Sequence, residues 1–221
     1  MKRLINTLVS LLLILNVLQA QETKPPFWND IQRFKSRDSA VLPAKNAILF
    51  VGSSSFTKWT DVQDYFPEYK IINRGFGGSS LPDLIRYADD IIFPYQPKQI
   101  VIYCGENDLA TSDTVTAQLV FERFKTLFEM IRAKMPSEPI AFVSLKPSPS
   151  RERLWPKMVE VNYLIKDYLK TKKHTAFIDV YNNMFDKNGA VMQDIFIGDR
   201  LHMNKKGYAI WQPLIKPYLV K

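Results

Sequence analysis

The sequence predicts an α/β protein in which helices cover both faces of a parallel sheet. Nearly continuous apolar runs alternate along the chain with segments of helical periodicity. Three of these runs end in polar clusters that contain glycine, and doubly wound folds bind ligands at such strand ends. With 221 residues, of which 46% are hydrophobic, the chain can bury one sizeable core. We therefore expect a single three-layer α/β/α domain.

Five apolar runs are predicted to be the strands of this sheet. Each run is nearly continuously apolar, as strands buried on both faces should be. The predicted strands are 47–52, 69–75, 99–105, 139–145 and 175–181.

Helices are predicted before the first strand and between the later ones. In the leading segment, Phe27, Ile31 and Phe34 recur on one helical face. The further helical segments are 80–92, 116–135, 155–173 and 204–219. No repeat, low-complexity tract or linker divides the chain, so we expect one domain.

The first twenty residues differ in composition from the rest. Lys2 and Arg3 precede a mostly apolar run that ends near Ala20, which is typical of an export signal peptide. The polar interruptions Asn6 and Asn16 make this run less suited to the alternative, an uncleaved membrane anchor of about 20 apolar residues. We expect residues 1–20 to be a signal peptide, residues 21–221 to be an exported domain, and no stable membrane insertion after cleavage.

The charge of the chain bears on its partners, and its cysteine content bears on disulfides. Without Lys2 and Arg3 the chain has 28 basic and 22 acidic residues, a net charge of +6. The excess is scattered and forms no long basic block, so nucleic acid is not an expected partner. The single cysteine, Cys104, cannot form an internal disulfide, and its place after an apolar run predicts burial at a strand end.

The first predicted strand ends in a glycine followed by Ser53, Ser54 and Ser55. A serine nucleophile needs a base, and the base needs an orienting group. Of the two histidines, His174 lies among lysines, as a solvated residue would. His202 follows Asp199 by three residues, a separation that a turn closes to within about 7 Å between Cα atoms. Asp199 and His202 are therefore candidates for catalysis, although such a pair also occurs in ordinary loops.

Acyl-ester hydrolysis also needs hydrogen-bond donors for the developing oxyanion. Gly77 and Gly78 provide backbone N–H groups at a strand-to-helix turn, and Asn107 provides a side-chain amide. Each of these residues could instead serve only the geometry of its loop.

Taken together, these clusters resemble the four sequence blocks of the SGNH hydrolases, also called GDSL esterases and lipases. They occur in the family's order and span most of the chain after residue 20. The four clusters are 52–54, 73–78, 105–108 and 199–202. The resemblance implies a five-stranded parallel sheet of flavodoxin-like order and the hydrolysis of carboxylic esters without a cofactor or metal.

Carried over by position, the resemblance makes Ser54 the nucleophile, His202 the base and Asp199 its orienting carboxylate. It makes Gly78, Asn107 and the backbone N–H of Ser54 the oxyanion donors. One position departs from the pattern, because Ser53 stands where the family usually has aspartate. The change removes a charge beside the nucleophile but no member of the triad.

Three other interpretations are weaker. An α/β-hydrolase would carry G-x-S-x-G, but Phe56 occupies the place of the final glycine. A dinucleotide-binding module would need a glycine at Ser80, and the chain has no Walker-type Gly-Lys-Ser/Thr sequence. A carbohydrate-binding relative without turnover is the third.

Three features suggest the substrate: the predicted export, the lack of a long apolar lid segment, and the loop after the fourth strand. Lys146, Arg151 and Trp155 lie in this Pro-rich segment, where cations would meet an anionic group and the indole would stack on a sugar. The alternative is a merely exposed connection. We expect a small-molecule or glycan ester substrate, most simply an acetyl or other short-acyl ester of carbohydrate. Lysophospholipid and thioester substrates remain open, as does the oligomeric state.

Overall fold

A computed structural model describes residues 24–221, so the predicted signal peptide lies outside the described residues. Its sheet has five parallel strands in the order β2-β1-β3-β4-β5. The strands are β1 (Ile48–Gly52), β2 (Ile71–Gly75), β3 (Gln99–Tyr103), β4 (Ile140–Val143) and β5 (Thr175–Ile178). This arrangement confirms the predicted fold class, including the flavodoxin-like strand order.

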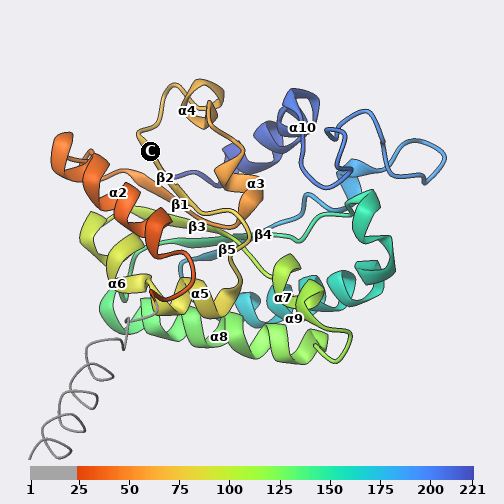
Figure 1. Cartoon of the computed structure of the whole chain (residues 1–221), viewed down its shortest axis with the longest axis horizontal. Helices are drawn as coiled ribbons and strands as arrows, with labels where there is room; N and C mark the ends of the chain where they lie inside the picture. Colours follow the sequence, from red (N-terminus) through yellow and green to blue (C-terminus); the bar gives the residue numbers. More distant parts are fainter. Residues whose placement is uncertain (1–23) are drawn as a thin grey trace, which may run out of the picture.

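Helices cover the two faces of the sheet as separate layers (Figure 1). One layer contains α5 (Leu81–Arg86), α6 (Ala88–Ile91), α8 (Ala117–Lys134) and α9 (Trp155–Lys170), with α2 (Trp28–Ala40) packed on α6. The opposite layer contains α3 (Ser54–Thr57), α4 (Val62–Tyr65) and α10 (Lys205–Ile215). The helix α7 (Glu106–Thr111) and the short 3₁₀ helices η1 (Phe93–Tyr95), η2 (Pro149–Leu154), η3 (Asn182–Met184) and η4 (Lys216–Tyr218) complete the chain.

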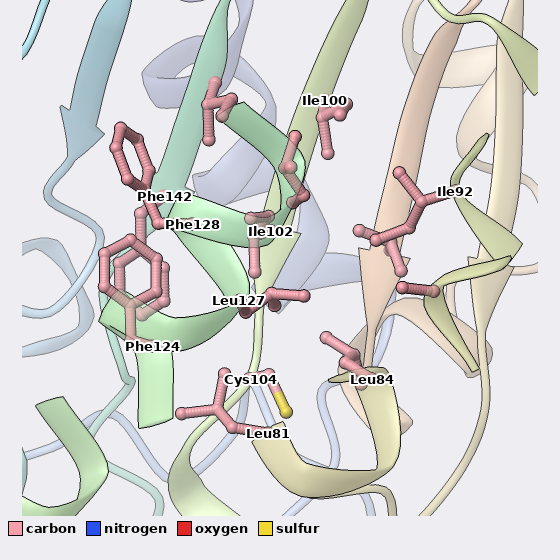
Figure 2. Packing of buried hydrophobic residues seen from close by; sticks show 14 of the residues in the cluster. Leu81, Leu84, Ile92, Ile100, Ile102, Cys104, Phe124, Leu127, Phe128 and Phe142 are labelled. Carbon is pink, nitrogen blue, oxygen red and sulfur yellow. The ribbon is translucent and has the colours of Figure 1, made fainter. Parts of the chain in front are cut away.

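Alternation of side chains along the strands divides the interior into two cores. Leu49 and Val51 of β1 point into the core under α8, whereas Ile48 and Phe50 point into the core under α10. In the first core, the ring of Phe124 from α8 meets that of Phe142 from β4 edge to face at 5.0 Å (Figure 2). Both faces of the central strands are therefore buried.

The structure differs from the sequence prediction at the edges and in the short elements. β1, β3 and β4 are buried throughout, but β2 and β5 are only partly buried because each forms an edge of the sheet. The single helix predicted over 80–92 is divided into α5 and α6. Three short helices, α3, α4 and α7, follow strands or loops and have too few turns to show a periodic pattern in sequence.

Residues 24–221 contain neither a candidate membrane span nor a candidate metal cluster. None of their helices is both long enough and apolar enough to cross a membrane. This part of the chain also has no cluster of three or more His, Cys, Asp or Glu side chains suited to a metal ion.

Candidate active site

The turn after β1 presents one of its three serines. A Cβ atom on Gly52 would lie 2.0 Å from the carbonyl oxygen of Tyr103, so only glycine allows β1 and β3 to approach this closely. Ser53 and Ser55 are buried, whereas Ser54, the first residue of α3, is partly exposed. Ser54 is therefore the serine of this turn that a substrate could reach.

The glycine turn after β2 lies against Ser54. A Cβ atom placed on Gly77 would be 4.0 Å from the Cβ of Ser54. The turn is held to the end of β1, since the N–H of Phe76 donates to the carbonyl of Gly52 at 3.0 Å. Gly78 has a φ of +87°, which favours glycine. Within residues 24–221 no backbone carbonyl accepts the N–H of Gly78 or Ser54, so both donors are open to a ligand.

Asn107 extends this group of donors from the third strand. Its Nδ2 donates to the carbonyl oxygen of Ser79 at 2.9 Å, which places the amide beside the glycine turn. Its Oδ1 accepts a hydrogen bond from Nη2 of Arg151 at 2.7 Å. The ends of β1, β2 and β3 thus bring Ser54, Gly78 and Asn107 to one edge of the sheet, as parallel strands require.

Asp199 and His202 form a closed pair in the loop before α10. Oδ2 of Asp199 lies 2.6 Å from Nδ1 of His202, and Oδ1 accepts the backbone N–H groups of Leu201 and His202, each at 2.9 Å. Burial alone would raise the pKa of Asp199, but the hydrogen bonds from the His202 ring and from the two N–H groups lower it to about 2. The carboxylate is therefore ionised and holds Nδ1 as its donor partner.

The second imidazole nitrogen is available for chemistry. Nε2 of His202 is buried and has no hydrogen-bond partner within the described residues. In particular, it is not hydrogen-bonded to the Ser54 hydroxyl. A general base of this kind needs an imidazole that is oriented by a carboxylate and has its other nitrogen free to accept a proton. His202 has both features.

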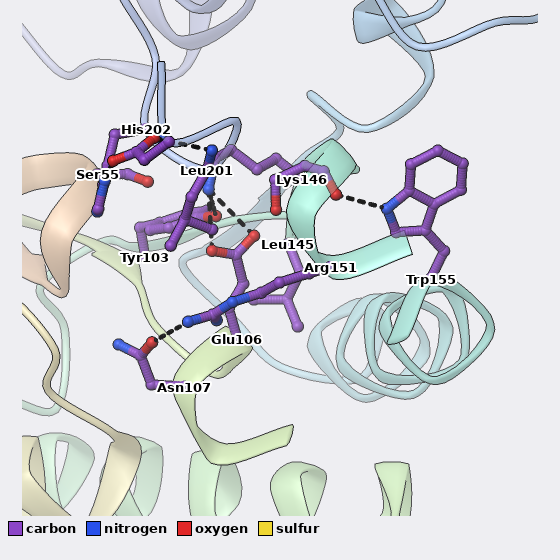
Figure 3. A network of polar contacts seen from close by, with 12 residues as sticks. Ser55, Tyr103, Glu106, Asn107, Leu145, Lys146, Arg151, Trp155, Leu201 and His202 are labelled. Atoms are coloured by element: carbon purple, nitrogen blue, oxygen red, sulfur yellow. Dashed lines mark hydrogen bonds and ion pairs between the residues drawn. The ribbon is translucent and has the colours of Figure 1, made fainter. Parts of the chain in front are cut away.

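Contacts of α10 hold the histidine loop beside the serine turn. Tyr208 of α10 donates its hydroxyl to the carbonyl of Ser55 at 2.8 Å, and its ring stacks on Trp59 at 4.7 Å. Asn204 caps the same helix by accepting the N–H of Lys206. The hydrogen bond from Tyr208 thus joins the helix that follows the histidine loop to the serine turn, which is about 150 residues earlier in the sequence, and Figure 3 draws His202 and Ser55 in the same polar network.

The three residues predicted to contact substrate occupy different environments. Lys146 is fully buried, and its Nζ donates to both carboxylate oxygens of Glu106, at 3.1 and 2.9 Å. Burial lowers the pKa of Lys146, and the charge of Glu106 opposes this shift. The loop is thus not simply an exposed connection, and the Lys146 ammonium is engaged inside the protein rather than facing an anionic ligand.

Trp155 also uses its polar atom within the protein. Its Nε1 donates to the carbonyl of Ser148 at 3.0 Å, and its ring packs edge to face on Phe185 at 6.0 Å. Figure 3 shows the indole on the far side of the network from His202. Of the three predicted contacts, only Arg151 touches a proposed catalytic group, namely Asn107.

Sequence reasoning overlooked the acidic residues that flank Asn107. Glu106 pairs with Lys146, and the fully buried Asp108 accepts the N–H of Leu81 at 3.0 Å and Nη1 of Arg123 at 2.8 Å. Two carboxylates directly after a buried strand were the available clue, because buried charges need partners. These pairs fix the element that carries Asn107.

Comparison with known proteins agrees with the fold. A GDSL-like lipase from Bacteroides thetaiotaomicron is 24% identical, with a TM-score of 0.69 over 85% of this chain and 95% of that one. A candidate acylhydrolase from Bacteroides fragilis is 25% identical, with a TM-score of 0.72 over 86% of this chain and 95% of that one. A catalytic mutant of an acetylxylan esterase from Geobacillus stearothermophilus is 13% identical, with a TM-score of 0.64 over 81% and 97% of the two chains.

Sequence comparison identifies the family. No curated protein matches the chain. The model of the GDSL-like lipase/acylhydrolase family, in contrast, matches residues 49–210, which include the five strands except for Ile48, together with Ser54, Asn107 and His202. The chain therefore belongs to the GDSL-like lipase/acylhydrolase family, the SGNH hydrolases, and is a carboxylic-ester hydrolase.

Proposed function

We propose that this hydrolase is an exported serine esterase that removes acetyl or other short acyl groups from carbohydrate through Ser54, His202 and Asp199. The observation that carries the catalytic part is the buried, unpaired Nε2 of His202, whose ring is oriented by Asp199. The export part rests on the residues before position 21, which have the composition of a signal peptide.

The proposed reaction has two halves. Nε2 of His202 takes the hydroxyl proton of Ser54 as Oγ attacks the ester carbonyl, and the N–H groups of Ser54 and Gly78 and the Asn107 amide hold the oxyanion. His202 then gives this proton to the leaving alcohol, which leaves an acyl-serine. Water attacks the acyl-serine by the same proton path and releases the acid.

A polar hollow beside the catalytic turn supports a polar alcohol portion in the substrate. This hollow, of about 440 Å³, is bounded by α2, by the α3 region and by the end of β2. Its lining residues are Asp30, Arg33, Phe34, Arg37, Thr57, Thr60, Asn73 and Gly75. Oγ1 of Thr57 is 4.0 Å from the position of a Cβ on Gly77, so the hollow adjoins the turn that faces Ser54. Hydroxyl and guanidinium groups suit a sugar better than a long acyl chain.

The test of the nucleophile uses the neighbouring Ser55 as a matched control. Ser54→Ala and His202→Ala should lower kcat by roughly 10⁴-fold or more, because each removes a member of the proton path. Asn107→Ala should lower kcat by about 10²- to 10³-fold through loss of one oxyanion donor. Ser55→Ala, at a buried position of the same turn, should retain turnover with 4-nitrophenyl acetate. Near-normal activity in Ser54→Ala together with a loss of activity in Ser55→Ala would show that Ser54 is not the nucleophile.

The substrate class needs a separate experiment. A series of 4-nitrophenyl esters from acetyl to dodecanoyl should show highest kcat/KM for the shortest acyl groups, and acetylated oligosaccharides should be deacetylated by wild type but not by Ser54→Ala. A preference for acyl chains beyond about eight carbons would instead indicate a lipid ester, since each buried methylene contributes about 0.8 kcal/mol. The intact mass of protein recovered outside the cytoplasm would test cleavage near Ala20.

A further inference from the structure

The Asn107 amide is held by two contacts of opposite polarity. A carbonyl, that of Ser79, accepts from Nδ2, and a guanidinium, that of Arg151, donates to Oδ1. The two ends of an amide side chain are similar in shape but opposite in hydrogen-bonding role. A rotated amide would place Oδ1 against the Ser79 carbonyl and Nδ2 against the guanidinium, so both contacts would become repulsive. Only one orientation of Asn107 satisfies both partners.

The main chain of the 3₁₀ helix η2 holds Arg151 in place. The N–H of Arg151 donates to the carbonyl of the fully buried Ser148 at 3.0 Å. The neighbouring N–H of Ser150 donates to the carbonyl of Arg200 at 3.0 Å, in the loop between Asp199 and His202. The segment that carries Arg151 therefore joins the oxyanion side of the site to the histidine side.

The positive charge of Arg151 is not neutralised nearby. Within residues 24–221 no carboxylate forms an ion pair with Arg151, whereas Arg123, Lys146 and Arg153 each have one. Glu106, which lies next to Asn107, is already bound to Lys146. Nη1 of Arg151 is buried and has no hydrogen-bond partner among the described residues. With no carboxylate to compete for it, the guanidinium is left to donate to the Asn107 amide as a charged partner.

We propose that Arg151 is a positioning residue for the oxyanion hole, which holds Asn107 with one Nδ2 hydrogen directed at the reacting carbonyl oxygen. This inference rests on the proposed function of Asn107 as an oxyanion donor. Arg151 acts through Asn107 and does not itself contact the oxyanion. It replaces the expectation that Arg151 binds an anionic group of the substrate.

Two physical effects give Arg151 this role. First, the hydrogen bond from a charged donor is stronger than a neutral one, and it prevents the amide from rotating between turnovers. Second, donation to Oδ1 withdraws electron density from the amide, which makes the remaining N–H a better donor as negative charge forms. The first effect keeps the donor in place and the second grows on going from ester to tetrahedral intermediate, so their loss should lower kcat more than it raises KM.

The test is a double-mutant cycle with a control from the same segment. Arg151→Met should lower kcat for 4-nitrophenyl acetate by about 10- to 100-fold and change KM by less than about threefold, a part of the loss expected for removing the donor itself. In an Asn107→Ala background the same substitution should change kcat by less than about threefold, because the group through which it acts is gone. Arg151→Lys keeps a charged donor and should recover part of the loss.

Arg153→Met is the matched control. Arg153 lies two residues further along η2, and its partner is the exposed Asp113. This variant should keep the wild-type kcat and KM. Thermal unfolding of each variant identifies a loss that comes from misfolding.

Several results would overturn the inference. A fall in kcat as large in the Asn107→Ala background as in wild type would show that Arg151 acts independently of Asn107. A raised KM with unchanged kcat would make it a substrate contact. The side-chain NH₂ resonances of Asn107, assigned by their absence in Asn107→Ala, should shift in Arg151→Met, and unchanged resonances would contradict the proposal without any use of turnover. A wild-type protein that hydrolyses none of the esters would refute the proposed function instead.

Discussion

At the scale of single residues, the pair formed by Asp199 and His202 shows how a short loop orients a base. Asp199 accepts three hydrogen bonds, two from backbone N–H groups and one from the imidazole. Arg200, between the two partners, has a φ of +56°, so the chain turns sharply enough to bring residues i and i+3 together. The carboxylate is thus pre-organised before any substrate arrives.

This pair should make stability depend on pH in the acid range. The pKa of Asp199 is about 2 in the fold, against 3.8 for the free side chain. A lowered carboxyl pKa contributes stability that is complete above about pH 4 and is lost as the pH falls towards 2. The difference in melting temperature between wild type and Asp199→Asn should therefore be largest near pH 5 and shrink towards pH 2. Calorimetric scans across this range measure it, and a difference that stays constant with pH would contradict the assignment.

At the scale of elements, the site is built on the turns and short helices that follow β1, β2 and β3. β1, β2 and β3 end together, and each passes into a tight turn or a helix of only four to six residues. The strands were predictable because their apolar runs must be buried on both faces. The helices α3 and α7 were not, since one or two turns leave no period to detect and depend on tertiary contacts for their stability.

We expect the buried Asp108 to be the residue that most strongly links α7 to α5 and α8. Its carboxylate accepts the N–H of Leu81 at the start of α5 and a guanidinium hydrogen bond from Arg123 of α8. Asp108→Ala should lower the free energy of unfolding by about 2–4 kcal/mol, because it leaves a buried N–H and a cation without their acceptor.

Urea denaturation of Asp108→Ala measures this loss, with Asp113→Ala as the control. Asp113 also accepts a hydrogen bond from an arginine, but its side chain is 83% exposed, so its removal should cost less than about 1 kcal/mol. Equal losses of unfolding free energy in the two variants would show that the buried Asp108–Arg123 pair contributes no more to stability than the exposed pair.

At the scale of the whole molecule, segments from both ends of the described chain close around the sheet. Phe27 packs edge to face on Phe76 at 5.3 Å, and its ring lies 3.6 Å from the position of a Cβ on Gly78, so the leading segment contacts the glycine turn while Gly77 and Gly78 stay exposed. At the other end, the buried Gln99 at the start of β3 donates to the carbonyl of Tyr218 at 2.7 Å and accepts the N–H of Val220 at 2.9 Å. The C-terminal residues are thereby fastened to a central strand.

Gln99→Ala should therefore weaken the whole domain. Loss of both hydrogen bonds detaches the C-terminal main chain from β3 and should lower the free energy of unfolding by about 1–3 kcal/mol. Gln118→Ala removes a hydrogen bond to Glu122 on an exposed helix face and should cost less than about 0.5 kcal/mol. Limited proteolysis should release the last residues faster in Gln99→Ala than in wild type, and equal release rates would argue against this role of Gln99.

The sequence by itself determined the fold class, the burial of Cys104 and the strand ends at which polar residues gather. It could do so because burial and periodicity are local properties that the residue order records. Only the tertiary structure decided which of the loop cations faces the site. Lys146 is neutralised inside the protein by a carboxylate 40 residues away, whereas Arg151 reaches an amide 44 residues away. The partner of a charged side chain depends on how distant strands align, and no local pattern in the sequence encodes that alignment.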